Sequence, residues 1–344
     1  MSDATIIRSN HLLDRTRRVL FEGIDPIRLD TYRRGLAFAF LVYVTYLMFN
    51  ASEWLTDDGF HLTADTQLLH AARPWPTMPK SLVPWFALAL YGSGICLILG
   101  KLTRPASWIF LACAIYVQRV DALTAFALNK LTIVGFAILA LAPPPRRVRF
   151  ADGRTVMLQS AWPVRVLQAT VLIMYCTSAV CKGVLGDWLR DPNVVWSVVQ
   201  GVFRTDLSSL LLRMMPKWFF SLLMYFVLAF EFFAPVLLIN KRLRPWGIAA
   251  GILLHVGLAS MMSTVFFFSL QMIMYYILFL PDSTLHQFRS WYTSPTKDAT
   301  TDLPADNARL RDIKAIATNE ATTDAEKVAS IRRLLDDLDE GTTQ

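Results

Sequence analysis

Eight long apolar runs constrain what this chain can fold into more than any other feature of the sequence. A helix needs roughly 20 mostly apolar residues to cross a bilayer core of about 30 Å. Runs of about that length begin near Gly35, Val83, Pro105, Ala122, Pro163, Trp218, Trp246 and Thr264. A soluble helical protein is the alternative, but it would need eight consecutive helices that lack a polar face. The sequence therefore predicts an all-α, polytopic membrane bundle of about eight transmembrane helices.

Composition agrees with this class and excludes others. The 344 residues are 54% hydrophobic and 18% charged, whereas soluble domains average about 45–50% apolar and about 25% charged. Such an apolar chain is not intrinsically disordered over most of its length. Its four Cys have neither zinc-like spacing nor a disulfide pattern, so we expect no metal site.

The basic residues are placed as in a multi-pass membrane protein. Alternate connections between the apolar runs, together with the lead-in before Gly35, hold sixteen Lys and Arg, whereas the other connections hold seven. Because Lys and Arg favour the cytoplasmic side, both termini are expected to be cytoplasmic, and the location is expected to be the cell (inner) membrane. The net charge of +7 then marks the cytoplasmic face, and we expect no nucleic-acid partner.

Composition divides the chain into three parts. Residues 1–34 read as a basic, amphipathic cytoplasmic lead-in that lies on anionic lipid, or as a plain solvated segment. Residues 35–281 form the transmembrane domain. Residues 282–344 form a polar, partly disordered cytoplasmic tail, in which Ala325–Leu338 has the spacing of a short amphipathic helix. That helix is a candidate site for a protein partner, or else an idle tail helix.

Four ionisable residues lie inside the apolar runs, where charge is costly and therefore marks function. Lys182 ends the fifth run, Lys130 follows Asn129 in the fourth, and Glu231 and His255 lie near the middle of the sixth and seventh. Each also has a structural interpretation. Lys182 can extend to the headgroups, Glu231 can be the counter-ion of a lysine, and His255 can be a hydrogen-bonded core histidine. Lys130 is deep enough that we expect a buried partner for it.

Taken together, these groups predict a membrane cavity that can deprotonate a lipophilic substrate. A lysine amine that has lost its proton is a competent general base or nucleophile, and a nearby carboxylate and imidazole can hold or relay the proton. The sequence contains no GxGxxG, Walker A, GxSxG or HExxH motif, so it shows no signature of a soluble enzyme class.

The segment Tyr175–Trp188 carries a family resemblance. Its sequence, YCTSAVCKGVLGDW, resembles the Y-x-x-A-G-x-K-K-x-x-x-D-W pattern found in the horizontally transferred transmembrane domain (HTTM) family, which includes the membrane part of vitamin K-dependent gamma-glutamyl carboxylase. The resemblance covers roughly residues 15–285 and is consistent in order and spacing at Arg33–Gly35, Asp58–Phe60, Trp162, Arg165, Glu231, Asn240–Arg244, His255, Phe268 and Leu278–Pro281.

The resemblance implies a role for Lys182 as the base that deprotonates a reduced quinone. Asn129 and Lys130 stand where the family's pattern has an Asn-His pair, and this departure puts epoxidation chemistry in doubt. Tyr175 and Trp188 are expected to contact the substrate, with Trp188 at the membrane interface. The carboxylase has a large exterior domain after its membrane bundle. Here the residues after Pro281 are polar and predicted cytoplasmic, so the resemblance does not extend to carboxylation of a protein.

Three functions therefore stay open from the sequence. The first is a carboxylase-like membrane enzyme with a lysine base, acting on a quinol-like or membrane-presented peptide substrate; a reduced quinone is its candidate cofactor. The second is a non-catalytic membrane protein in the maturation of, or immunity to, a secreted peptide. The third is a proton-coupled transporter, which the lack of visible inverted repeats disfavours.

Overall fold

The computed structural model describes residues 16–17, 19–61, 75–120, 127–149 and 155–292. The contacts divide the chain into one unit that ends at Leu285 and a second that begins at His286. The first unit contains all the predicted apolar runs. The predicted tail helix, Ala325–Leu338, lies outside the described residues.

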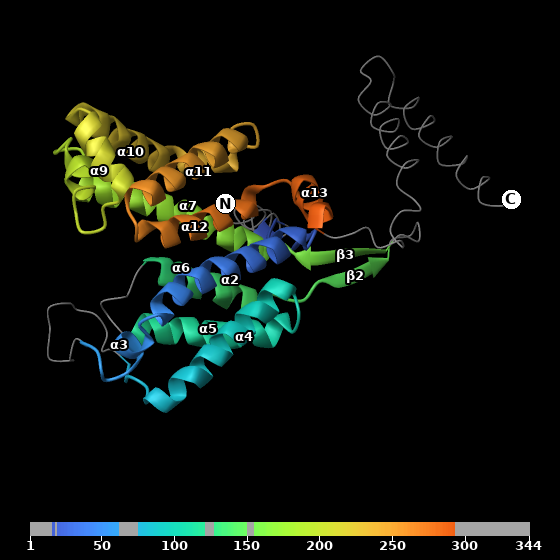
Figure 1. Cartoon of the computed structure of the whole chain (residues 1–344). Helices are drawn as coiled ribbons and strands as arrows, with labels where there is room; N and C mark the ends of the chain where they lie inside the picture. Colours follow the sequence, from blue (N-terminus) through green and yellow to red (C-terminus); the bar gives the residue numbers. More distant parts are fainter. Residues whose placement is uncertain (1–15, 18, 62–74, 121–126, 150–154, 293–344) are drawn as a thin grey trace, which may run out of the picture. The chain divides into compact units, whose positions relative to one another are not determined.

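Each of the eight apolar runs corresponds to a helix in the described part of the chain (Figure 1). The helices are α2 (Ile27–Met48), α4 (Val83–Leu99), α5 (Thr103–Val120), α6 (Ala127–Leu141), α7 (Trp162–Val180), α10 (Lys217–Ile239), α11 (Arg244–Met261) and α12 (Val265–Tyr276). A proline stands in the first turn of α4, α7 and α11, where its missing N–H has no intrahelical partner to lose.

Shorter elements connect or follow these helices. They are α3 (Ala51–Leu55), η1 (Lys80–Leu82), η2 (Cys181–Leu185), α8 (Val194–Val198), α9 (Asp206–Met214), η3 (Ile277–Phe279) and α13 (Asp282–Tyr292). The structure also contains a small antiparallel sheet of β1 (Gly23–Ile24), β3 (Thr155–Ser160) and β2 (Arg146–Arg149), in that order. The all-α prediction missed this sheet. In the basic hairpin, Arg146 pairs with Leu158 and Val148 with Val156.

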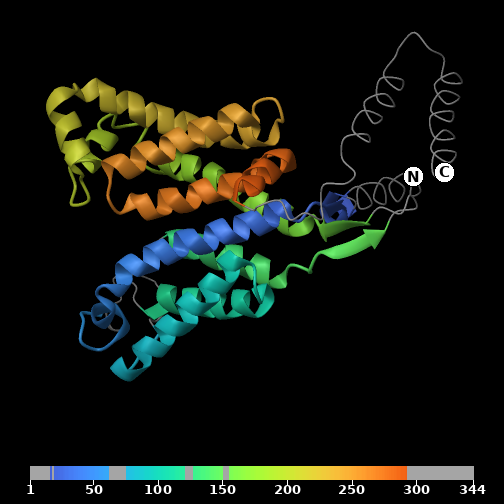
Figure 2. The ribbon, with the colours of Figure 1, turned by 45° about the vertical axis from the view of Figure 1, so that its right-hand side comes forward.

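The large helices pack in a closed sequence of neighbours. Figures 1 and 2 show these helices from two directions. Helix α2 packs against α4 and α12; α5 packs against α4 and α6; and α10 packs against α7 and α11. Contacts of α11 with α12 and of α6 with α7 complete the arrangement. The core is rich in aromatic side chains, and Phe110 stacks edge-to-face on both Phe40 and Phe136.

Helix α2 begins at Ile27 rather than near Gly35, so it includes several charged residues that the sequence analysis placed in the lead-in. Their charges are compensated locally. Asp30 contacts the guanidinium groups of both Arg33 and Arg34. Arg34 also donates to the carbonyl of Ile98, 2.8 Å away, at the end of α4. Gly100 closes that helix at φ +75°, and a Cβ there would lie 2.7 Å from the Arg34 guanidinium.

The chain is mostly helical and carries helices that can cross a membrane. Three are long and apolar enough: Lys80–Leu99, Trp162–Leu185 and Lys217–Ile239. A fourth meets the same test if Val265–Phe279 and Asp282–Ser290 are counted as one broken span. The outward faces are apolar as well, since Trp85, Trp218 and Trp246 are each more than 60% exposed. Exposed aromatic surface of this kind suits contact with lipid and would be unusual in water.

Candidate functional site

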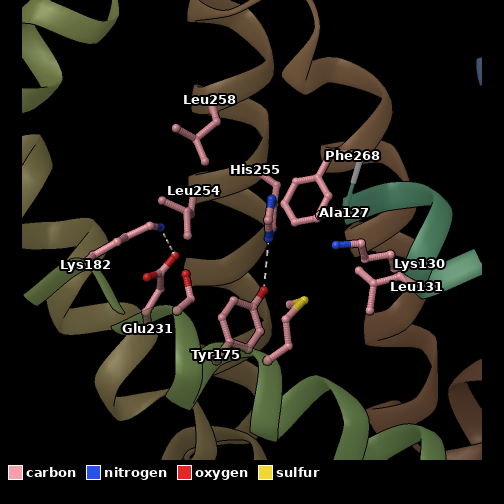
Figure 3. Close-up of a pocket in the computed structure, with 12 residues that line it drawn as sticks. Ala127, Lys130, Leu131, Tyr175, Lys182, Glu231, Leu254, His255, Leu258 and Phe268 are labelled. Atoms are coloured by element: carbon pink, nitrogen blue, oxygen red, sulfur yellow. Dashed lines mark hydrogen bonds and ion pairs between the residues drawn. The ribbon is translucent and has the colours of Figure 1, made fainter. Parts of the chain in front are cut away.

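A cavity of about 380 Å³ lies between α6, α7, α10, α11 and α12 (Figure 3). Five of the residues singled out from the sequence line it, namely Lys130, Tyr175, Lys182, Glu231 and His255. Most of the remaining lining is apolar and consists of Ala127, Leu131, Met174, Ser178, Leu254, Leu258 and Phe268. Its volume lies within the range of about 300–1,000 Å³ that is typical of small-molecule sites.

Lys182 and Glu231 form an ion pair on the wall of the cavity. The Nζ of Lys182 donates to Oε1 of Glu231 over 2.5 Å, and the same ammonium lies 4.9 Å from the centre of the Trp188 ring. The Glu231 side chain is 8% exposed and the Lys182 side chain 30% exposed. In the described part of the chain, the second carboxylate oxygen, Oε2, is buried without a hydrogen-bond partner. The pair therefore has one polar atom left for a bound group.

Both members of this ion pair lie in or next to a stretch of irregular backbone. Lys182 lies in η2, a π-helical turn that continues α7, and such turns are frequent at functional sites. Gly186 follows this turn, and a Cβ there would lie 2.9 Å from the carbonyl oxygens of Cys181 and Lys182. On α10, Pro235 stands four residues after Glu231 and has no N–H to donate to the Glu231 carbonyl.

A chain of buried hydroxyl and imidazole groups adjoins the cavity, with Tyr175 and His255 in the cavity wall and Tyr276 behind them. The Tyr175 hydroxyl lies 2.9 Å from Nε2 of His255 and 2.5 Å from the Tyr276 hydroxyl. All three side chains are 2% exposed. Figure 3 shows the hydrogen bond between Tyr175 and His255 beside the ring of Phe268. His255 is therefore a hydrogen-bonded core histidine that also faces the cavity.

Lys130 lies in the first described turn of α6, across the cavity from Lys182 in Figure 3. The side chain is exposed, and the described residues include no ion-pair or hydrogen-bond partner for its ammonium. The described residues therefore do not support the expectation that Lys130 has a buried partner. Glu231 pairs with Lys182 and not with Lys130, so it is the counter-ion of Lys182.

The other two predicted residues lie beside the cavity without lining it. The Asn129 side chain is fully buried, and Trp188 contacts the site through the Lys182 ammonium. The sequence analysis missed Ser178 and Tyr276. Ser178 could have been found from the sequence, because Tyr175, Ser178 and Lys182 follow one another at intervals of three and four residues and so share one helix face. No cluster of three or more metal-ligating side chains occurs among the described residues.

Comparisons with known proteins add no family assignment at this point. No family model, no curated protein and no solved structure matches the chain.

Proposed function

We propose that this chain is an HTTM-family membrane enzyme that deprotonates a lipophilic substrate in the cavity at Lys182. The observation that supports the proposal most is convergence. Lys130, Tyr175, Lys182, Glu231 and His255 come from five separate elements, and all line one mostly apolar cavity. Ionisable groups are rare at membrane depth and are generally retained there for function.

The Lys182–Glu231 pair is suited to proton transfer. In a low-dielectric environment a neutral amine and a neutral carboxylic acid compete with the ion pair, because desolvating two charges is costly. Transfer of one proton from the Lys182 ammonium to Glu231 leaves a neutral amine. That amine can take a proton from a substrate hydroxyl, and the resulting ammonium stabilises the substrate anion. Lys130 supplies a second positive charge on the opposite wall.

The substrate class follows from the lining. Apolar walls formed by Leu131, Leu254 and Leu258 suit the body of a lipophile, and the polar groups suit its reacting end. We propose a reduced quinone or a similar hydroxylated lipophile as the substrate, with a membrane-presented peptide as the second candidate. Trp188 and Tyr175 would contact it, and Asn129 together with Lys130 would assist the Lys182 base from α6.

The proposal includes a topology. We infer about eight membrane spans, with both termini cytoplasmic, in the inner membrane of the cell. The excess of Lys and Arg in alternate connections supports this orientation. The cavity residue Lys182 and the neighbouring Trp188 then lie toward the exterior end of α7.

The test is turnover of a defined quinol. The full chain in lipid nanodiscs is given a short-chain naphthoquinol and oxygen. Because the quinol is oxidised by oxygen through its anion, deprotonation is followed by mass spectrometry as conversion of the quinol to the quinone, with oxygen reduced to hydrogen peroxide. We expect conversion by the wild type and at least a 100-fold loss in Lys182→Met, which is a typical contribution of a general base. Lys217→Met is the matched control, because Lys217 also lies over a tryptophan, Trp196 at 4.2 Å, but does not line the cavity.

Two results would contradict the proposal. One is full turnover by Lys182→Met, and the other is a wild type that converts the quinol no faster than empty nanodiscs do. If the wild type instead moves protons across proteoliposomes when a solute gradient is applied, the chain is a transporter rather than an enzyme.

A further inference from the structure

His255 is the cavity residue whose protonated nitrogen the structure allows to be assigned. Its ring lines the cavity and the side chain is 2% exposed. Nε2 lies 2.9 Å from the Tyr175 hydroxyl. In the part of the chain that the structure describes, Nδ1 is buried and has no hydrogen-bond partner. A neutral imidazole carries one ring proton, so its two nitrogens cannot both be donors.

The direction of the hydrogen bonds can be followed from Tyr276. Its hydroxyl lies 2.5 Å from that of Tyr175 and has no other partner among the described residues. It sits against Gly251 of α11, where a Cβ would come within 2.0 Å of the hydroxyl oxygen. The Tyr276 proton therefore has one acceptor available, the oxygen of Tyr175.

Once Tyr276 donates to Tyr175, the proton of Tyr175 is directed to His255. Nε2 must then be the acceptor, and the ring proton must be on Nδ1. The opposite direction would leave two buried groups without a partner, the Tyr276 hydroxyl proton and the Nδ1 lone pair, whereas the first direction leaves one, the Nδ1 proton. Each buried polar group without a partner is destabilising, so the first direction is the better satisfied one. No carboxylate contacts the ring in the described residues to favour the imidazolium.

We propose that Tyr276 and Tyr175 are positioning residues that hold His255 in its Nδ1–H tautomer, so that His255 is a hydrogen-bond donor available to an acceptor oxygen of the molecule in the cavity. The hydrogen bond to a bound molecule rests on the proposed function, whereas the tautomer of His255 does not. The hydrogen-bonded series Tyr276–Tyr175–His255, called the relay below, joins three helices. Tyr276 lies on α12, Tyr175 on α7 and His255 on α11.

The test is nitrogen NMR on the full chain labelled with ¹⁵N-histidine in nanodiscs at neutral pH. The sequence contains five His, and a His255→Gln sample identifies the signals of interest. We expect Nδ1 of His255 to be protonated and Nε2 to be unprotonated. A spectrum in which Nε2 carries the proton, or both nitrogens do, would overturn the proposal. The wild-type spectrum is sufficient for this decision, and it requires no substrate.

Three single variants test the positioning role. Tyr175→Phe removes the donor to Nε2 and should shift the population toward the Nε2–H form. Tyr276→Phe frees the Tyr175 hydroxyl to donate or accept, so a mixture of tautomers is expected. Tyr275→Phe is the control, since the neighbouring Tyr275 hydroxyl donates to the Leu131 carbonyl at 2.8 Å and lies outside the relay.

An unchanged Nδ1–H form in both Tyr175→Phe and Tyr276→Phe would rule out the positioning role even if the wild-type tautomer is as expected. Failure of the quinol assay leaves the tautomer result standing, because the NMR measurement is made without a ligand. The two proposals can therefore fail separately.

Discussion

At the scale of single residues, the Lys182–Glu231 ion pair is the contact whose removal has the clearest energetic consequence. Glu231→Gln leaves the Lys182 ammonium beside a neutral amide. Breaking a buried pair typically costs 3–5 kcal/mol. Because Lys182 is 30% exposed and can reach the membrane interface, we expect a smaller loss of about 1–3 kcal/mol. The measurement is reversible unfolding of the full chain in mixed micelles.

The control for this prediction is an exposed pair. Asp58→Asn removes the partner of Lys80, where the two side chains are 47% and 70% exposed, and should cost less than about 1 kcal/mol. The double variant Lys182→Met/Glu231→Gln should be more stable than Glu231→Gln alone, because it buries no unpaired charge. Equal losses in Glu231→Gln and Asp58→Asn would mean that the cavity pair is no more consequential than a surface contact.

The charged members of the site were predictable from the sequence, whereas which of the singled-out residues contact one another was left open. Lys130, Lys182, Glu231 and His255 stand out because each is ionisable within an apolar run. Lys182 and Glu231 are 49 residues apart, and nothing local specifies that they meet. Tyr276 could not be identified in advance, because a tyrosine among apolar residues is ordinary and its role depends on contacts with α7 and α11.

At the scale of elements, the π-helical turn η2 determines where the Lys182 amine lies. Gly186→Ala should disturb this turn, because the new Cβ would meet two backbone carbonyl oxygens at 2.9 Å and backbone cannot yield as a flexible side chain does. We expect turnover to fall at least tenfold and stability by about 1–3 kcal/mol, as for other overpacked sites. Quinol turnover and unfolding in the same micelles are the two measurements.

Gly183→Ala is the matched control within the same turn. Its Cβ would lie 3.6 Å from Leu189 Cδ1, which is an ordinary contact distance, so turnover should change by less than about twofold. If Gly186→Ala is as active as Gly183→Ala, then η2 does not position the Lys182 amine for the reaction.

The long helices were predictable because an apolar run in lipid must satisfy its own backbone, and a helix does so internally. The turn η2 was not predictable, since the residues Cys181–Leu185 are also compatible with an ordinary helix. The hairpin of β2 and β3 was missed for a related reason. Its strands are short, and the basic residues of Arg146–Arg149 are typical of a connection that flanks a membrane span rather than of a strand.

At the scale of the whole molecule, the inferred topology predicts which connections are reached from each side of the membrane. Single cysteines introduced in a cysteine-free variant report this with a membrane-impermeant maleimide. Arg190→Cys lies in the segment after α7 and should react in intact cells. Arg147→Cys, in β2, and Lys241→Cys, between α10 and α11, should react only after the membrane is opened.

These three sites separate the possible orientations. Helix α7 lies between Arg147 and Arg190, and α10 lies between Arg190 and Lys241, and both helices are long and apolar enough to cross a membrane. If both helices cross the membrane, Arg190 must lie on the opposite side of the membrane from Arg147 and Lys241. The reverse pattern, with Arg190 protected, would invert the orientation and place Lys182 toward the cytoplasm. Equal labelling of all three in intact cells would mean that α7 and α10 do not span. It would then remove the membrane cavity on which the proposed chemistry depends.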